Sequence, residues 1–297
     1  MSSDAILCAG RLYCDLVFTG APNLPVVGTE TFCDGLSLHA GGGAFITAAA
    51  FSALGWQTSL LATLPAAPFD TIVARDIDRF QIDVSRCSSA PAGASPQLTV
   101  AITNNDDRAF LSHKAGPALP NHGQLGGDFR HLHIGELRSL VEHPDLIAQA
   151  KQAGATVSVD CSWDNALLDQ GSAMAELLSQ VDVFLPNTLE YGRLACSGLR
   201  DTAGPLIVVK CGAEGARAYH GGAWIAEPAV PTAAIDTTGA GDAFNGGFLS
   251  AWLHGQPVEA CLKQGNACGS AAVEHPGGTG GLSSLSATLA EDRVNAG

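Results

Sequence analysis

The stretch AAIDTTGAGDAFNGGFL, residues 233–249, is the most informative part of this chain. A short β-branched segment ends at Ile235, a turn of Asp and Thr follows, and Gly239-Ala240-Gly241 leads into an apolar run suited to a helix. Glycines ahead of a helix let the backbone approach a ligand, and the free N–H groups of the first turn attract an anion. Asp242 is then either a helix cap or a base beside a bound phosphate. Because the stretch lacks the Lys-Ser/Thr of a P-loop and does not fit the dinucleotide fingerprint, it predicts an anion site of another kind.

The same stretch resembles the closing signature D-T-x-G-A-G-D of the ribokinase-like (PfkB-type) carbohydrate kinases, and the resemblance spans nearly the whole chain. The matching positions are Asp236, Thr237, Gly239, Ala240, Gly241 and Asp242. The resemblance implies that Asp242 contacts the substrate and takes the proton from its hydroxyl group. It also implies that the amides of Gly239, Ala240 and Gly241 hold the transferring phosphoryl group. Phosphoryl transfer needs positioning, charge neutralisation and a base, so the chemistry agrees.

Short apolar runs alternate with longer stretches of helical composition. The runs lie at 5–10, 59–64, 131–135, 156–160, 181–187 and 206–212, and the helical stretches at 44–54, 70–80, 142–153, 173–180, 241–254 and 257–273. This alternation predicts an α/β fold with a mostly parallel sheet covered on both faces. Ligands of such sheets bind at the carboxyl ends of the strands, where we expect Asp15, Asn187, Lys210 and Asp242.

Two stretches interrupt the alternation, residues 16–39 and 96–112. Both have strand-like pieces with turn residues, and the second reads as a hairpin around residues 104–107. The resemblance implies a single three-layer α/β/α ribokinase-like domain over residues 1–297, in which these stretches form a small β-sheet lid over the sugar. The alternative is that both are extra edge strands of the main sheet.

The substrate side is indicated by two N-terminal motifs. Residues 10–15 resemble the family's G-x-x-x-x-D, whose aspartate, here Asp15, binds substrate hydroxyls; by itself Asp15 equally fits a turn cap. Residues 41–55 resemble the first glycine signature, which implies that the backbone of Gly41 and Gly42 packs against the sugar.

The chain departs from the family pattern at two places on the substrate side. Ile46 occupies the substrate-binding position where many sugar kinases have an asparagine, and residues 65–69 replace the usual Gly-Asp-Asp turn. An apolar Ile46 favours a less hydroxylated substrate, or a base in place of sugar hydroxyls. The departures therefore bear on the substrate rather than on the reaction.

The nucleotide side is indicated by later motifs. Asn187-x-x-Glu190 matches a family motif that orders Mg²⁺ through its water shell; in isolation it indicates a helix cap. The resemblance assigns the nucleotide to Asn187, Lys210, Gly212, Gly215, Gly241 and Asn266, although a lysine at a strand end is usually solvated. Asp236 is a candidate for a monovalent-cation ligand. The implied cofactors are ATP and Mg²⁺, with K⁺ as a candidate.

Composition excludes several classes of function. The 297 residues carry a net charge of −14 with lysines only at 114, 151, 210 and 263, which argues against a nucleic-acid partner. The chain contains no apolar run of about 18 residues and no basic segment at its start, so we expect neither a membrane span nor a signal peptide. Nine cysteines without a C-x-x-C pair predict reduced, buried thiols in a cytoplasmic protein. His131 and His133, on one side of an expected strand, have no nearby acid or thiol to complete a metal site and are interpreted as structural.

These observations predict an ATP-dependent kinase that transfers the γ-phosphoryl group to a primary hydroxyl of a sugar or sugar derivative. One alternative is a nucleoside kinase of the same superfamily. Another is a non-catalytic sugar sensor, which would not need to keep Asp242. Because a small open sheet cannot bury both of its faces, we also expect a homodimer through the lids, with Val17, Val26, Val27 and Leu98 on the outer face.

Overall fold

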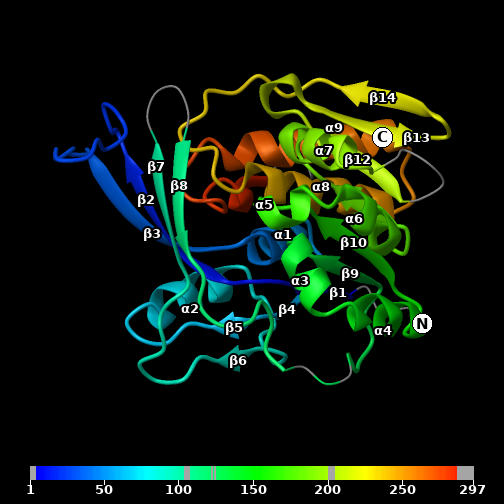
Figure 1. Cartoon of the computed structure of the whole chain (residues 1–297), viewed down its shortest axis with the longest axis horizontal. Helices are drawn as coiled ribbons and strands as arrows, with labels where there is room; N and C mark the ends of the chain where they lie inside the picture. Colours follow the sequence, from blue (N-terminus) through cyan, green and yellow to red (C-terminus); the bar gives the residue numbers. More distant parts are fainter. Residues whose placement is uncertain (1–4, 104–107, 122, 124, 200–204, 286–297) are drawn as a thin grey trace.

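An eight-stranded, mostly parallel sheet forms the centre of the protein (Figure 1). The structure is a computed structural model that describes residues 5–103, 108–121, 123, 125–199 and 205–285. In spatial order the strands are β14 (Ala223–Glu227), β13 (Ala216–His220), β12 (Leu206–Lys210), β11 (Val183–Leu185), β10 (Thr156–Asp160), β9 (His131–Ile134), β1 (Ala5–Ala9) and β4 (Gln57–Leu61). All neighbours from β12 to β4 pair in parallel, whereas β13 and β14 are antiparallel. The α/β prediction is confirmed.

Helices cover both faces of this sheet, which gives three layers. Successive residues of β1 point to opposite sides, so that Ile6 and Cys8 join one buried cluster while Leu7 and Ala9 join the other. The first cluster contains residues of α1 (Gly43–Ala53), α2 (Asp70–Arg79), α8 (Ala240–Leu253) and α9 (Val258–Ala272). The second contains residues of α3 (Leu137–Glu142), α4 (Asp145–Gln152), α5 (Asn165–Leu168), α6 (Gly171–Leu178) and α7 (Thr188–Cys196).

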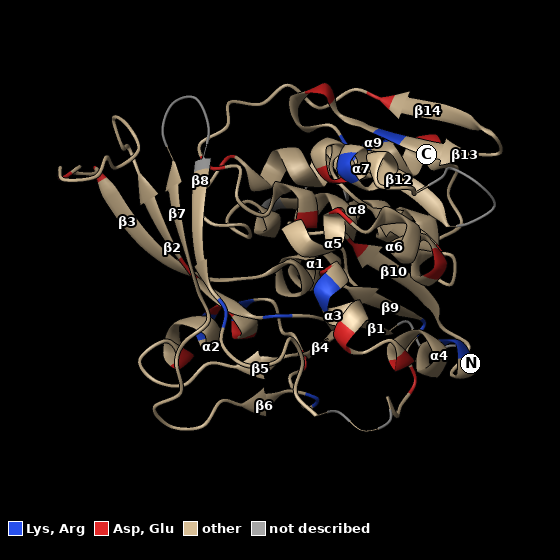
Figure 2. Ribbon diagram, viewed as in Figure 1, with Lys and Arg blue, Asp and Glu red and all other residues tan. Residues whose placement is uncertain are grey.

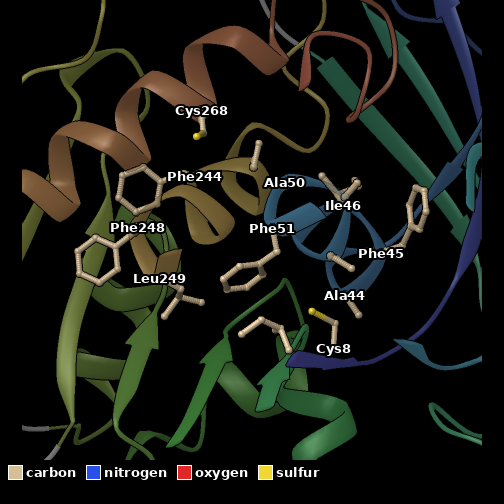
Figure 3. Packing of buried hydrophobic residues seen from close by; sticks show 14 of the residues in the cluster. Cys8, Ala44, Phe45, Ile46, Ala50, Phe51, Phe244, Phe248, Leu249 and Cys268 are labelled. Atoms are coloured by element: carbon tan, nitrogen blue, oxygen red, sulfur yellow. The ribbon is translucent and has the colours of Figure 1, made fainter. Parts of the chain in front are cut away.

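Helices α1, α8 and α9 pack together on the first face (Figure 3). Glycines make room for their close contacts. A Cβ atom at Gly246 would lie 2.5 Å from Ala50 Cβ, and one at Gly247 would lie 2.7 Å from Cys268 Sγ. Phe51 and Phe248 are fully buried beside these contacts, and each contributes roughly 1.5–3 kcal/mol of apolar burial. This packing fixes α8, whose N-terminus carries the glycine-rich motif.

A separate four-stranded sheet is built from the two irregular stretches. Its order is β3 (Gly35–Gly41), β2 (Tyr13–Thr19), β7 (Leu98–Thr103) and β8 (Arg108–His113). The pairs β2–β3 and β7–β8 are antiparallel, whereas β2 and β7 run parallel. The expected small sheet is confirmed and the edge-strand alternative is wrong. The hairpin turn at 104–107 lies outside the described residues. A minor pair, β5 (Thr63–Leu64) and β6 (Ser88–Ser89), follows β4.

The small sheet has two different faces. Strand register places Asp15, Val17, Thr99, Phe110 and Ser112 on its inner face. The outer face is mostly apolar, with Leu16, Phe18, Leu36, Leu38, Leu98, Val100, Ile102, Ala109 and Leu111. His113 lies opposite Leu98 on the same face, and Leu16, Leu38 and Leu98 pack against the first buried cluster. The expected outer position is therefore correct for Leu98 and wrong for Val17, which is buried on the inner face. Val26 and Val27 are exposed in the connection between β2 and β3, not on a strand.

Three local expectations need correction. Ile235 does not end a strand: it is exposed in an irregular segment, and its N–H donates to Val273 O. Asp15 lies inside β2 rather than in a turn directly after β1. The hairpin β13–β14 was not expected, although Gly221-Gly222 between two alternating segments is a hairpin signal.

Other expectations agree with the structure. All nine cysteines are free, but the expectation that they are buried holds for only five of them: Cys33, Cys87 and Cys211 are half-buried and Cys196 is exposed. His131 and His133 both hydrogen-bond to Ser158 Oγ, and burial lowers the pKa of each imidazole, so both are neutral structural residues. Of the helices in the described ranges, none combines the length and hydropathy that a membrane span needs.

Candidate active site

A cavity of about 1250 Å³ lies between the carboxyl ends of the main sheet and the inner face of the small sheet. It brings together most of the sequence-predicted residues: Asp15, Gly42, Ile46, Asn187, Glu190, Lys210, Gly212, Gly215, Gly239, Ala240, Gly241, Asp242 and Asn266. Two predicted residues, Gly41 and Asp236, do not line it. The residues come from strand ends, from the start of α8 and from the small sheet, as expected for a parallel α/β fold.

The glycine turn before α8 is shaped by close contacts. Gly239 has a left-handed φ of 70°, and a Cβ atom there would lie 2.6 Å from Gly278 Cα and 2.8 Å from Ile46 Cδ1. Only glycine fits this position. The helix begins at Ala240, so the N–H groups of its first turn lie at the positive end of the helix dipole, at the cavity. Of these groups, Ala240 N–H makes a long hydrogen bond of 3.3 Å to Thr237 O. An anion is favoured there.

Asp242 lies in this first turn, and its carboxyl group approaches α1. A Cβ atom at Gly43 would meet Asp242 Oδ1 at 2.9 Å, so the glycine of α1 makes room for the acid. Burial and, to a smaller extent, the charge of Asp160 raise the pKa of Asp242 to about 7, although Lys210 lowers it. Such a carboxyl group accepts a proton near neutral pH.

Lys210, the last residue of β12, is held by two partners. Its Nζ donates to Asp160 Oδ2 at 2.6 Å and to Asn245 Oδ1 at 3.2 Å. Asn245 Nδ2 in turn donates to Asp160 Oδ2. The alternative of a solvated lysine is wrong, because the Lys210 side chain is only 12% exposed.

Asn187 and Glu190 form both the helix cap and part of the cavity wall. Asn187 Oδ1 accepts from the N–H groups of Leu189 and Glu190, and Glu190 Oε2 accepts from Asn187 N–H at 2.8 Å. The capping box uses Asn187 Oδ1 and Glu190 Oε2, whereas Asn187 Nδ2 and Glu190 Oε1 take no part in it. Burial, with the nearby Asp160, raises the pKa of Glu190 to about 7.

Asp15 reaches the cavity from the small sheet. A Cβ atom at Gly41, the residue of β3 that pairs with Tyr13, would lie 1.9 Å from Asp15 Oδ2. Gly41 therefore accommodates the Asp15 carboxyl group instead of lining the cavity itself. Burial raises the pKa of Asp15 to about 7, against a hydrogen bond from Thr99 that lowers it.

The remaining predicted residues have local structural contacts as well. Ile46 is buried, and its Cδ1 atom packs beside Gly239 and Gly278, so little of it is presented to a substrate. Asp236, also buried, accepts from Thr238 N–H at 2.9 Å and from Gly277 N–H at 2.8 Å. Asn266 Nδ2 donates to the carbonyl groups of Glu227 and Pro228 at 3.0 Å.

Several cavity residues were not identified from the sequence. They include Arg11, Thr99, Glu136, Asp160, Ser162 and Trp163. Asp160 carried a usable signal, because an acid ends the apolar run TVSVD at the carboxyl edge of the sheet. Arg11 pairs with Glu136 at 3.4 Å, a contact across 125 positions that only the fold reveals. Ser162 has a left-handed φ of 53°, which no sequence pattern predicts.

Known proteins resemble this chain over most of its length. The family described as "pfkB family carbohydrate kinase" matches residues 15–285. An ATP-dependent ribose-1-phosphate kinase from Halopiger xanaduensis is 26% identical over 277 residues, which cover 89% of this chain and 90% of that protein. Among solved structures, a nucleoside kinase from Methanocaldococcus jannaschii has a TM-score of 0.80 at 21% identity, covering 98% of this chain and 99% of that one. A ribokinase from Cryptococcus neoformans in complex with ADP has a TM-score of 0.81 at 20% identity, covering 98% and 100%. The chain belongs to the pfkB family of carbohydrate kinases.

Proposed function

We propose that this kinase transfers the γ-phosphoryl group of ATP to a primary hydroxyl of a sugar or sugar derivative, as a single domain whose segments 16–39 and 96–112 form the lid. The observation that carries the proposal is the Asp242 carboxyl group, buried beside the glycine turn in a cavity that Asp15 enters from the opposite sheet. A sensor would not require a base at this point, so the arrangement favours catalysis.

In this reaction Asp242 accepts the proton of the acceptor hydroxyl as the oxygen attacks the γ-phosphorus, and ADP leaves. The amides of Gly239, Ala240 and Gly241 stabilise the charge of the transferring group, aided by the dipole of α8. Lys210 supplies a positive charge on the same side, because its Nζ lies 3.4 Å from where a Cβ atom of Gly241 would be. Asp15 binds and orients acceptor hydroxyls.

The donor set fits Mg²⁺ bound through water. Glu190 and Asp242 add two carboxyl groups beside the Lys210–Asp160 ion pair, and hard oxygen donors suit Mg²⁺. Within the described residues, no three His, Cys, Asp or Glu side chains are grouped to ligate one ion directly. Glu190 would orient the water shell, and Asn187 a phosphate. Bound with ATP, Mg²⁺ would neutralise phosphate charge.

A monovalent cation such as K⁺ suits the loop of Asp236. This buried carboxylate receives two backbone N–H groups, and Thr238 Oγ1 beside it is buried without a hydrogen-bond partner. A cation bound there would be a partner for the Asp236 carboxylate and for Thr238 Oγ1. The rest of the nucleotide would lie along Gly212, Gly215 and Asn266, at the edge near β13.

A nucleoside is the second candidate acceptor, supported by two aromatic side chains. Phe110 and Trp163 line the cavity and are about half exposed, at 49% and 50%. A planar nucleobase would bury the exposed faces of these two rings, whereas a sugar alone would leave them in contact with water. Ile46 gives little support for a nucleoside acceptor, since its side chain packs against the glycine turn.

The proposed partner besides these small molecules is a second copy of the chain. The outer face of the small sheet is apolar apart from His113, and Leu36 and Leu111 are 53% and 74% exposed there. The strands carry few charges (Figure 2). Two such faces pressed together would remove this surface from water. Nine free cysteines and the charge of −14 support a cytoplasmic location without a nucleic-acid or membrane partner.

The test of this function is Asp242→Asn. Loss of a general base lowers kcat by about 10²–10⁴-fold, while the shift in melting temperature caused by ATP and Mg²⁺ should be retained. Asp169→Asn, at an exposed carboxylate paired with Arg193, is the control and should keep the parent kcat. Turnover of Asp242→Asn within threefold of the parent would refute the assignment.

A further inference from the structure

We propose that Asp160 and Asn245 are positioning residues that hold the Lys210 ammonium group beside the glycine turn, where it meets the transferring phosphoryl group. The inference rests on the proposed kinase function and concerns two residues that the family motifs quoted above do not include. The three side chains are called the Lys210 triad below.

The Lys210 triad joins three elements. Asp160 ends β10 and Lys210 ends β12, on either side of β11, so their backbones lie about 10 Å apart. Asn245 projects from the second turn of α8, the helix whose first turn carries Asp242. The triad therefore fixes the start of α8 relative to the carboxyl edge of the sheet.

The hydrogen bonds of the triad form a closed set. Asn245 is fully buried; its Oδ1 accepts from Lys210 Nζ and its Nδ2 donates to Asp160 Oδ2, the oxygen that also accepts from Lys210. An ammonium group has three protons. Two are directed to Asp160 and Asn245, which leaves one for a phosphoryl oxygen.

The position of the ammonium group matches that use. A Cβ atom at Gly241 would lie 3.4 Å from both Nζ and Cδ of Lys210, so the lysine stem passes directly beside the backbone of the anion hole. A methyl group at Gly241 would be in van der Waals contact with this stem.

Stability alone gives a weak reason for such a pair. The Lys210 and Asp160 side chains are 12% and 6% exposed, and a buried ion pair gains little over apolar residues of similar size. The pair does remove the freedom of a long side chain, and a preorganised charge stabilises a transition state better than a mobile one. The geometry therefore favours a catalytic reason for the triad.

A double-mutant cycle tests the proposal, with Asp160→Asn, Lys210→Met and the double variant. The measurements are kcat and the KM for ATP with Mg²⁺, using the acceptor that gives the parent enzyme its highest rate of ADP release. We expect Lys210→Met to lower kcat by about 10²–10³-fold and Asp160→Asn by about 10–100-fold. The KM for ATP should change less than threefold, because the charge acts on the group in transfer. The double variant should be no slower than Lys210→Met, since Asp160 acts through the lysine.

The control is the Lys151–Asp182 pair, which joins the same residue types at the amino ends of the strands. Lys151→Met and Asp182→Asn should leave kcat unchanged. Activity in these controls supports the kinase function even if the triad variants behave differently from the proposal. Effects of Asp160→Asn and Lys210→Met that multiply in the double variant, or a parent-like kcat in Asp160→Asn, would overturn the proposal. If Asp160→Asn does not fold, Asn245→Ala replaces it in the cycle with the same expected non-additivity.

Discussion

At the scale of single residues, the environment of Asp242 links structure to chemistry. The carboxyl group is surrounded by Asp160 on β10, Lys210 on β12, Glu190 on α7 and Asp15 on β2. Three negative neighbours and burial outweigh one lysine, and the pKa of Asp242 rises to about 7. A base with this pKa is partly protonated under neutral conditions, which makes its titration visible in kinetics.

The predicted pH dependence follows from the sign of this shift. Because only the deprotonated carboxylate accepts a proton, kcat/KM for the acceptor should fall about tenfold per pH unit below pH 7 and level off above it. The profile is measured at saturating ATP and Mg²⁺, so that titration of the free nucleotide does not contribute. A kcat/KM for the acceptor that stays constant down to pH 5 would contradict a raised pKa at the base.

Single residues also mark the limit of sequence reasoning. The glycine motif identified Gly239 and Asp242 because backbone chemistry requires those residue types at that spacing. Gly41 was assigned to substrate, whereas its actual role, space for Asp15, depends on the pairing of β2 with β3. Asp160 was missed since its function as a partner of Lys210 arises across two strands.

At the scale of elements, α7 shows that a structural and a functional interpretation of one motif can both hold. Asn187 caps the helix and also lines the cavity. Alternating apolar runs predicted six strands of the main sheet, since each is buried on both faces. The hairpin β13–β14 escaped this pattern because it lies at the sheet edge and is only half-buried.

A substitution at Asn187 separates the two roles. Serine is as good an N-cap as asparagine, so Asn187→Ser should change the free energy of unfolding by less than about 0.5 kcal/mol. It lacks the amide that would reach a phosphate, so the KM for ATP should rise about tenfold or more. Denaturant unfolding and steady-state kinetics measure the two quantities. An unchanged KM with an unchanged stability would restrict Asn187 to the cap.

At the scale of the whole molecule, the outer face of the small sheet determines the assembly that we expect. Light scattering at micromolar concentration should give about twice the 30.3 kDa of one chain. Replacing both Leu36 and Leu111 by serine makes this face polar, so that variant should have the mass of one chain. Leu189→Ser, at an exposed leucine of α7, is the control and should remain dimeric. A parent protein of single-chain mass would reject the interface.

The central claim, phosphoryl transfer from ATP to a small hydroxylated acceptor, is tested most directly by a coupled assay of ADP release. The parent enzyme and Asp242→Asn are assayed with ATP and Mg²⁺ against sugars, sugar acids and nucleosides, and the phosphorylated product is identified by mass spectrometry. We predict acceptor-dependent ADP release by the parent, highest with a sugar or sugar derivative, and a loss of about 10²–10⁴-fold in Asp242→Asn. Acceptors that raise the melting temperature of the parent without any ADP release would contradict the account.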